Sequence, residues 1–74
     1  MNMFQAYDEI PMSELNLLSS SAKVEVLPEH QGDHRWSATY SEPADGGLTI
    51  RVVGHGSTIE YALRDLYWKL YVDR

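Results

Sequence analysis

Three histidines are the residues of this chain whose chemistry best suits metal binding. The candidate ligands are His30 and His34, with their acidic neighbours Glu29 and Asp33, and the more distant His55. Imidazole and carboxylate groups bind Zn²⁺, but an H-x-x-x-H pair converges on one ion most readily when a helix places both rings on one face. Gly32 lies between the first two histidines and disfavours a helix. We therefore expect a solvated polar loop and no cofactor, with a metal site as the alternative.

Nucleophilic catalysis has few candidate residues. The chain contains no cysteine, and Ser57, two positions after His55, is better placed to cap a helix than to attack a substrate. Gly54 and Gly56 flank His55 as in an anion-binding turn, but Glu60 would bring a negative charge to the same helix end. The sequence has no nucleotide-binding fingerprint. We expect a protein that is not an enzyme.

The most clearly predicted element is a helix that begins near Ser57. The sequence Ser57-Thr58-Ile59-Glu60 matches a capping box, in which Ser57 is the N-cap and Glu60 reaches back to its amide. Apolar residues then recur at helical spacing to about Val72. The stripe consists of Ile59, Ala62, Leu63, Leu66 and Leu70, with Tyr67 at its margin. This pattern predicts a helix with one buried face.

The opposite face of this helix carries the side chains that we expect to bind a partner. They are Tyr61, Arg64, Trp68 and Tyr71. Tyrosine, tryptophan and arginine are the residue types enriched at interface hot spots. If one helix packs on one sheet, this face is exposed to solvent. In the alternative, the N-terminal segment folds over it and makes it a second internal core.

Three segments with alternating apolar and polar residues predict strands. We expect the inward-facing residues to be Val24 and Val26 in the first, Trp36, Ala38 and Tyr40 in the second, and Leu48, Ile50 and Val52 in the third. Pro28 is expected to end the first strand, and glycine-containing turns separate the three. If the inward residues of the second and third strands share a face, the two residue numbers of each facing pair add up to an even number. This requires a loop of odd length, such as Pro43 to Gly47.

The 74 residues suffice for one small domain. A short helix is predicted from Pro11 to Ser19, because proline suits the first helical position and apolar residues recur every three positions. The element order is then α-β-β-β-α. The fold class is α+β, with a three-stranded antiparallel meander packed by the C-terminal helix. We expect residues 1–10 to form an arm that could be flexible, and residues 11–74 to form the domain.

The balance of charges indicates the class of partner. Six basic against eleven acidic residues give a net charge of −5, and the basic residues are scattered. Direct binding to nucleic acid is disfavoured, because affinity for phosphates depends on concentrated Lys and Arg, whereas a basic protein surface would be attracted. The sequence has neither a signal-like N-terminus nor an apolar run of membrane-spanning length. We expect a cytoplasmic protein that does not bind membranes.

Residues 36–70 contain WSATY, a GG pair, a strand and the pattern G-S-T-x-E-x-A-L-x-x-L. This combination resembles the N-terminal domain of HicB-type antitoxins, whose fold is similar to a partial ribonuclease-H fold. The resemblance implies a module that binds a small toxin and often oligomerises.

These observations predict a small, acidic, non-enzymatic protein-interaction module. It would act as an accessory or inhibitory protein of bacterial or phage origin, through the outer face of the C-terminal helix. The partner would be another protein with a basic surface, or a second copy in a homodimer. Two alternatives stay open. One is a HicB-like toxin binder, and the other is a metal-binding domain or enzyme that uses the loops of His30, His34 and His55.

Overall fold

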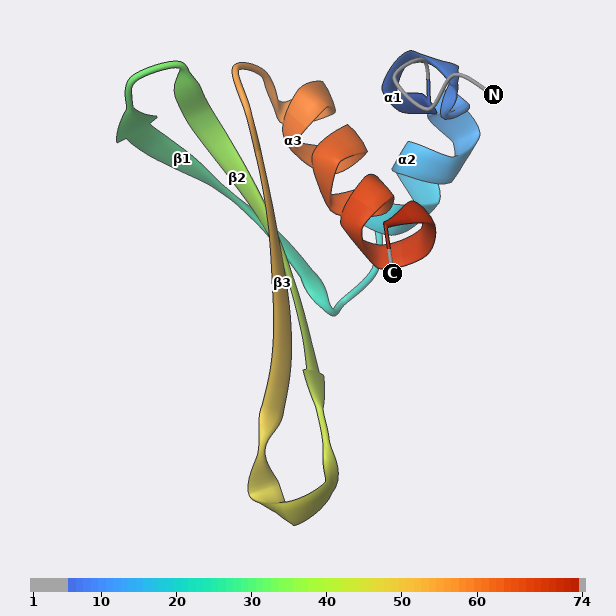
Figure 1. The fold of residues 1–74 in the computed structure, drawn as a ribbon, viewed down its shortest axis with the longest axis vertical. Coiled ribbons are helices and arrows are strands. Elements are labelled where there is room, and N and C mark those ends of the chain that lie inside the picture. The colour runs from blue at the N-terminus through green and yellow to red at the C-terminus, as the bar shows by residue number, and fades with distance from the viewer. Residues whose placement is uncertain (1–5, 74) are drawn as a thin grey trace.

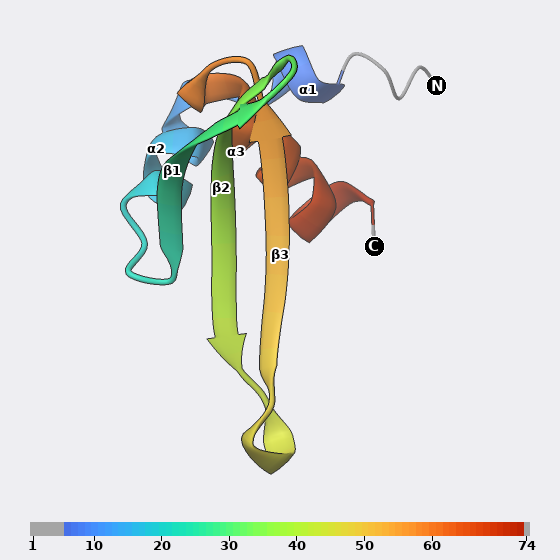
Figure 2. The same ribbon diagram turned by 90° about the vertical axis from the view of Figure 1, so that its left-hand side faces the viewer.

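The computed structural model describes residues 6–73 and confirms the predicted α+β fold (Figure 1). The main elements are α1 (Ala6–Glu9), α2 (Met12–Ser19), β1 (Val24–Gln31), β2 (His34–Pro43), β3 (Thr49–Gly56) and α3 (Ile59–Tyr67). The strands form one antiparallel sheet in the order β1-β2-β3, and the helices lie on one side of it (Figures 1 and 2). The predicted short helix near the N-terminus is present as α2.

The pairing of β2 with β3 has the predicted parity. Tyr40 faces Val52 and Ala38 faces Gly54, so the facing numbers sum to an even number. The last facing pair joins Pro43 to Thr49, which leaves a loop of odd length that contains the short 3-10 helix η2 (Asp45–Gly47). The two glycines of η2 have φ angles of 76° and 77°, a backbone region that glycine adopts without steric cost. The apolar alternation therefore determined the register correctly.

The first strand is longer than its sequence suggested. Pro28 was expected to end it, and this prediction is wrong, because Pro28 faces Trp36 and β1 continues to Gln31. The register shifts between Pro28 and Gln31. Proline is tolerated at this position because β1 is an edge strand, where a missing amide hydrogen removes no essential ladder bond.

Helix α3 begins one residue later than the predicted capping box. The N-cap is Thr58, whose Oγ1 accepts a hydrogen bond from the Tyr61 amide at 3.1 Å, so the assignment of Ser57 as N-cap is wrong. Glu60 does not reach back to the cap but pairs with Arg64 one turn later. The predicted end near Val72 is confirmed, because the π-helical segment η3 (Trp68–Val72) continues α3.

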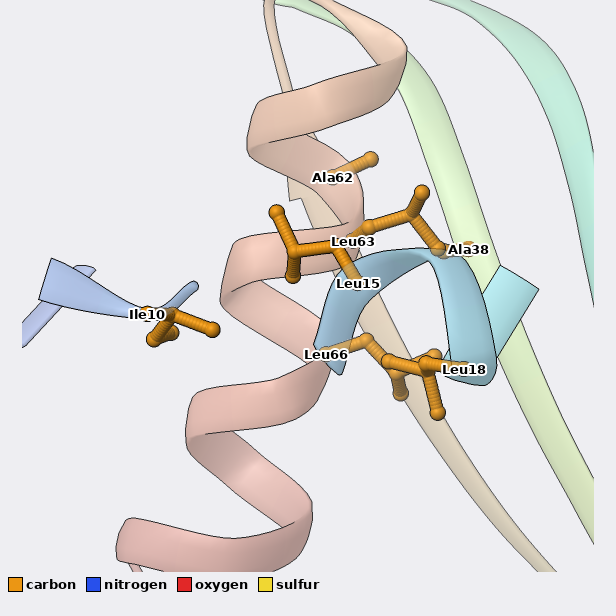
Figure 3. Close-up of a cluster of buried hydrophobic side chains, with 7 residues drawn as sticks. All are labelled: Ile10, Leu15, Leu18, Ala38, Ala62, Leu63 and Leu66. Atoms are coloured by element: carbon orange, nitrogen blue, oxygen red, sulfur yellow. The ribbon is translucent and has the colours of Figure 1, made fainter. Parts of the chain in front are cut away.

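The backbone of α3 lies directly against β3 at two glycines. A Cβ atom at Gly54 would lie 2.6 Å from the Ala62 carbonyl oxygen, and one at Gly56 would lie 2.6 Å from the Tyr61 carbonyl carbon. Both distances are too short for any side chain, and the atoms met are backbone atoms that cannot move aside. Ala62 and Leu66, which lie in the turns of α3 that meet Gly54, belong to the buried core (Figure 3). It comprises Ile10, Leu15, Leu18, Ala38, Ala62, Leu63 and Leu66.

Three residues expected in the core are instead exposed. Leu48 is 69% exposed and Ile50 is 50% exposed, because the β2–β3 hairpin extends well past the helical layer (Figure 1). Ile59, in the first turn of α3, is also exposed. Leu48 lies just before β3, so its predicted place in the third strand is wrong. Alternation placed Ile50 on the correct face of the sheet, but among residues 6–73 the helical layer does not cover that face fully at this end.

We predict that Gly54→Ala lowers the free energy of unfolding by about 3 kcal/mol, at the upper end of the cost of overpacking, because the added methyl group collides with the α3 backbone. Urea denaturation followed by circular dichroism measures the change. Arg51→Ala, at an exposed position of the same strand, serves as the control and should change stability by less than about 0.5 kcal/mol. Equal stability of Gly54→Ala and wild type would contradict the close approach.

Candidate functional site

The outer face of α3 is partly covered by the N-terminal segment. Arg64, one of the four predicted partner-binding residues, is only 7% exposed. Its guanidinium donates hydrogen bonds to the backbone carbonyls of Ile10, at 2.9 Å, and Tyr7, and its Nε donates to Glu60 at 2.9 Å. A buried guanidinium is stable only when its donors are satisfied in this way. Arg64 therefore fixes the connection between α1 and α2 and is not available to a partner in this structure.

Trp68 is half-buried on the same face. Its ring lies against that of Tyr7, with 5.2 Å between the ring centroids and 41° between the ring planes. The Tyr7 hydroxyl donates a hydrogen bond to Asp65 of α3. At Arg64 and Trp68 the structure therefore has the second arrangement considered from the sequence, in which the N-terminal segment folds over this face. Residues 1–5 of the expected arm lie outside the described residues, whereas Tyr7, Asp8 and Ile10 contact the C-terminal helix.

The other two predicted residues are exposed at opposite ends of the helix. Near its start, Tyr61 donates a hydrogen bond to Asp8 at 3.3 Å. In η3, Tyr71 is 57% exposed and packs against Tyr67 with 4.7 Å between ring centroids. The four side chains therefore do not form one continuous exposed surface, and Tyr71 belongs to a different surface from the other three.

That different surface is a groove between the helical layer and the protruding β2–β3 hairpin. It consists of two hollows of about 390 and 430 Å³, and both are lined by Tyr40 and Tyr71. Leu17 of α2 lines the first hollow and Ile50 of β3 lines the second. We call the two hollows together the Tyr71 groove. Sequence reasoning did not find it, since it had assigned Tyr40 and Ile50 to the core.

The charged side chains that line the Tyr71 groove are two carboxylates and one ammonium group. Glu14 lines the first hollow, where its carboxylate accepts a hydrogen bond from the Tyr67 hydroxyl at 3.3 Å. Glu42 and Lys69 line the second hollow. Both are already paired, Glu42 with Lys23 at 3.1 Å and Lys69 with Asp65 at 3.0 Å. The groove therefore offers apolar and aromatic surface with carboxylates close by.

A second cluster lies at the other end of the sheet. The structure brings two of the three predicted histidines, His34 and His55, together with Glu29. The Nδ1 atom of His55 lies 2.9 Å from Oε1 of Glu29, and the rings of His55 and His34 have centroids 5.3 Å apart. His30, the third predicted candidate, is exposed and lies outside this cluster. The pairing of three strands, not the spacing of two histidines, creates the cluster.

Asp65 and Lys69 of the C-terminal helix bond to the outer edge of β3. Asp65 accepts a hydrogen bond from the His55 amide, and Lys69 donates one to the Val53 carbonyl, both at 2.9 Å. Burial alone would raise the pKa of Asp65, but the bonds from Tyr7, His55 and Lys69 together hold it below its ordinary value. The pKa of Tyr7 is raised, mainly by burial and to a smaller extent by its hydrogen bond to Asp65. This carboxylate thus joins the N-terminal segment, the helix and the sheet.

Comparisons with protein-family models, with curated proteins and with solved structures found no match to this chain. The likeness of residues 36–70 to HicB-type antitoxins therefore stays a prediction. Within residues 6–73, no helix combines the length and the apolar composition needed to cross a membrane.

We predict that Asp65→Asn destabilises the protein at neutral pH by about 2 kcal/mol, the scale of hydrogen bonds to a charged group. Because folding lowers the pKa of Asp65, its contribution is fully present above the ordinary carboxyl pKa of about 4 and is lost as the pH falls through the lower folded-state value. The stability difference from wild type should therefore shrink below about pH 4. Urea denaturation across pH 3 to 7 measures it. A difference that does not depend on pH would contradict the role of the charge. Asp45→Asn, at an exposed position, is the control and should change stability by less than about 0.5 kcal/mol.

Proposed function

We propose that this chain is a small protein-interaction module that binds a segment of another protein in the Tyr71 groove. The observation that carries the proposal is the gathering of large apolar side chains outside the core. Leu17 is 67% exposed, Tyr71 is 57% exposed and Ile50 is 50% exposed, and all three line the same groove. Single exposed apolar residues are ordinary, but a contiguous patch with a polar rim is typical of an interaction site.

The shape of the groove supports the binding of a short segment. The β2–β3 hairpin forms one wall and the α2 and η3 segments form the other, while Tyr40 lines both hollows. Both walls belong to regular elements, so the groove needs little ordering when a partner binds. Tyrosine is well suited to such a position, because its ring supplies a large contact area with few rotatable bonds.

Charge defines the class of partner. Two carboxylates, Glu14 and Glu42, line the groove against one ammonium group, Lys69, and the whole chain carries a net charge of −5. A segment with apolar side chains flanked by Lys or Arg would complement this surface and would be attracted from a distance. We therefore commit to a basic, amphipathic segment of another protein as the occupant. Toxin binding, which the HicB resemblance implies, would be one instance of this role, and a toxin-sized open reading frame beside the gene would favour it.

The proposal keeps the predicted class of function but changes the residues that perform it. The sequence indicated the outer face of α3 through Tyr61, Arg64, Trp68 and Tyr71. In the structure, contacts with the N-terminal segment occupy Arg64 and Trp68, so of these four only Tyr71 lines the groove. A second copy of the chain is the competing occupant.

We predict that Tyr71→Ser weakens binding of the partner about thirtyfold, the effect of losing a hot spot worth about 2 kcal/mol. The partner would first be isolated with the wild-type chain and mass spectrometry, and its Kd for each purified variant would then be measured by calorimetry. Leu17→Ser should act in the same direction. Tyr61→Ser is the matched control, because it removes another exposed tyrosine, one that lies in α3 away from the groove.

Unchanged circular dichroism spectra would show that each variant is folded, as expected for exposed positions. Equal affinity of wild type and Tyr71→Ser for the partner would contradict the proposal. So would light scattering that shows a wild-type dimer and a Tyr71→Ser monomer, since the groove would then hold a second copy.

A further inference from the structure

We propose that Glu29, His34 and His55 form a binding site for one Zn²⁺ ion. Each residue offers one ligand atom, and these three atoms lie within 4.8 Å of one another. The cluster is independent of the Tyr71 groove and shares no lining residue with it.

The site depends on the irregular end of the sheet. Trp36 of β2 faces Gly56 of β3, so their side chains point to the same face of the sheet. Strict alternation would put His34, two residues before Trp36, on that face and His55, one residue before Gly56, on the other. The register shift between Pro28 and Gln31, together with the turn before His34, interrupts this alternation. Bulges of this kind redirect side chains and are over-represented beside functional sites. Here the interruption allows one residue from each of the three strands to converge.

The position of His55 is fixed by its surroundings. Its amide donates to the Asp65 carboxylate at 2.9 Å, and its neighbours in the chain, Gly54 and Gly56, lie against the α3 backbone. Its Nδ1 atom is held 2.9 Å from Oε1 of Glu29, and both side chains are half-buried. Two of the three donors are therefore already in place beside each other.

An ordinary histidine–glutamate pair accounts for Glu29 and His55 but not for His34. The exposed His34 side chain makes no hydrogen bond within residues 6–73, yet its ring centroid lies 5.3 Å from that of His55. Two imidazole rings this close, beside one carboxylate, form a donor set that a cation would complete.

The donor types select the metal. Two imidazole nitrogens and one carboxylate oxygen form a set used by zinc sites, in which water occupies the fourth position of a tetrahedron. Zinc bonds of about 2.0–2.2 Å place neighbouring ligands about 3.3 Å apart, so His34 needs only a small side-chain movement to join the other two. Mg²⁺ and Ca²⁺ prefer oxygen ligands alone and should not bind here.

A zinc ion at this position would join the ends of β1, β2 and β3. Small domains with limited cores are often stabilised by a metal or by disulfides, and this chain contains no cysteine. Zinc at a hundredfold excess over its Kd should raise the Tm by about 10–20 °C, as expected for a domain of this size. Magnesium chloride at the same concentration should leave the Tm unchanged.

The test is a titration of the full chain with zinc chloride, followed by calorimetry and thermal unfolding. Wild type should bind one Zn²⁺ per chain. His34→Ala should weaken binding by more than about a hundredfold, since loss of even an outer-sphere partner of a metal ligand costs about 10–100-fold. His30→Ala is the matched control, an exposed histidine of the same hairpin that lies outside the cluster, and it should bind within about twofold of wild type.

Substitution of the exposed His34 should leave the apo protein folded, with a Tm equal to that of the His30→Ala apo protein. The proposal is overturned if wild type binds no Zn²⁺, if His34→Ala binds as tightly as wild type, or if His30→Ala loses as much affinity as His34→Ala. It is also overturned if zinc binds with the expected stoichiometry but leaves the Tm of wild type unchanged.

Discussion

The structure depends on the close contact between the backbone of α3 and the backbone of β3 at Gly54 and Gly56. Side chains normally keep a helix well above a sheet, whereas these two glycines let the turns around Ala62 and Leu66 rest on the strand itself. This contact fixes which part of the sheet the helix covers. It also brings the helical side chains Asp65 and Lys69 within reach of the free edge of β3, where they bond to the His55 amide and the Val53 carbonyl. These two side chains thus satisfy backbone groups at the free edge of β3, where no further strand pairs with it.

The helical layer on the sheet is completed by a short segment of few residues. Without this segment, one side of α3 would be open to solvent. The segment from α1 to α2 covers it, with Ile10 and Leu15 in the core. Polar contacts hold this layer as much as apolar ones, since Arg64 bonds to the carbonyls of two residues in the segment and the Tyr7 hydroxyl bonds to Asp65. The layer ends before the hairpin does, which leaves the Tyr71 groove uncovered.

Much of the fold could be predicted from the sequence, because alternation and helical spacing report local geometry. They gave the order of elements, the odd loop and the end of the C-terminal helix. They could not say whether anything covers a face, so Leu48 and Ile50 were assigned to a core that does not extend to them. Nor could helical spacing show that Arg64 would find its acceptors in carbonyls more than fifty positions earlier. The convergence of Glu29 on His34 and His55 depends on hairpin pairing and a register shift, which no spacing rule for metal ligands includes.

The two proposed sites lie at opposite ends of the β2–β3 pair, and this separation has a physical consequence. His34 begins β2 and His55 is near the end of β3, whereas Tyr40 and Ile50 lie toward the hairpin loop. The strands between them are paired continuously from Trp36–Gly56 to Pro43–Thr49. A bound ion would tie β1 to this pair at one end but would add no contact in the groove, which is lined by β2, β3, α2 and the C-terminal helix. Metal binding should therefore change the stability of the domain without changing the affinity of the groove for a partner. A substitution in one site should then abolish one role and leave the other intact.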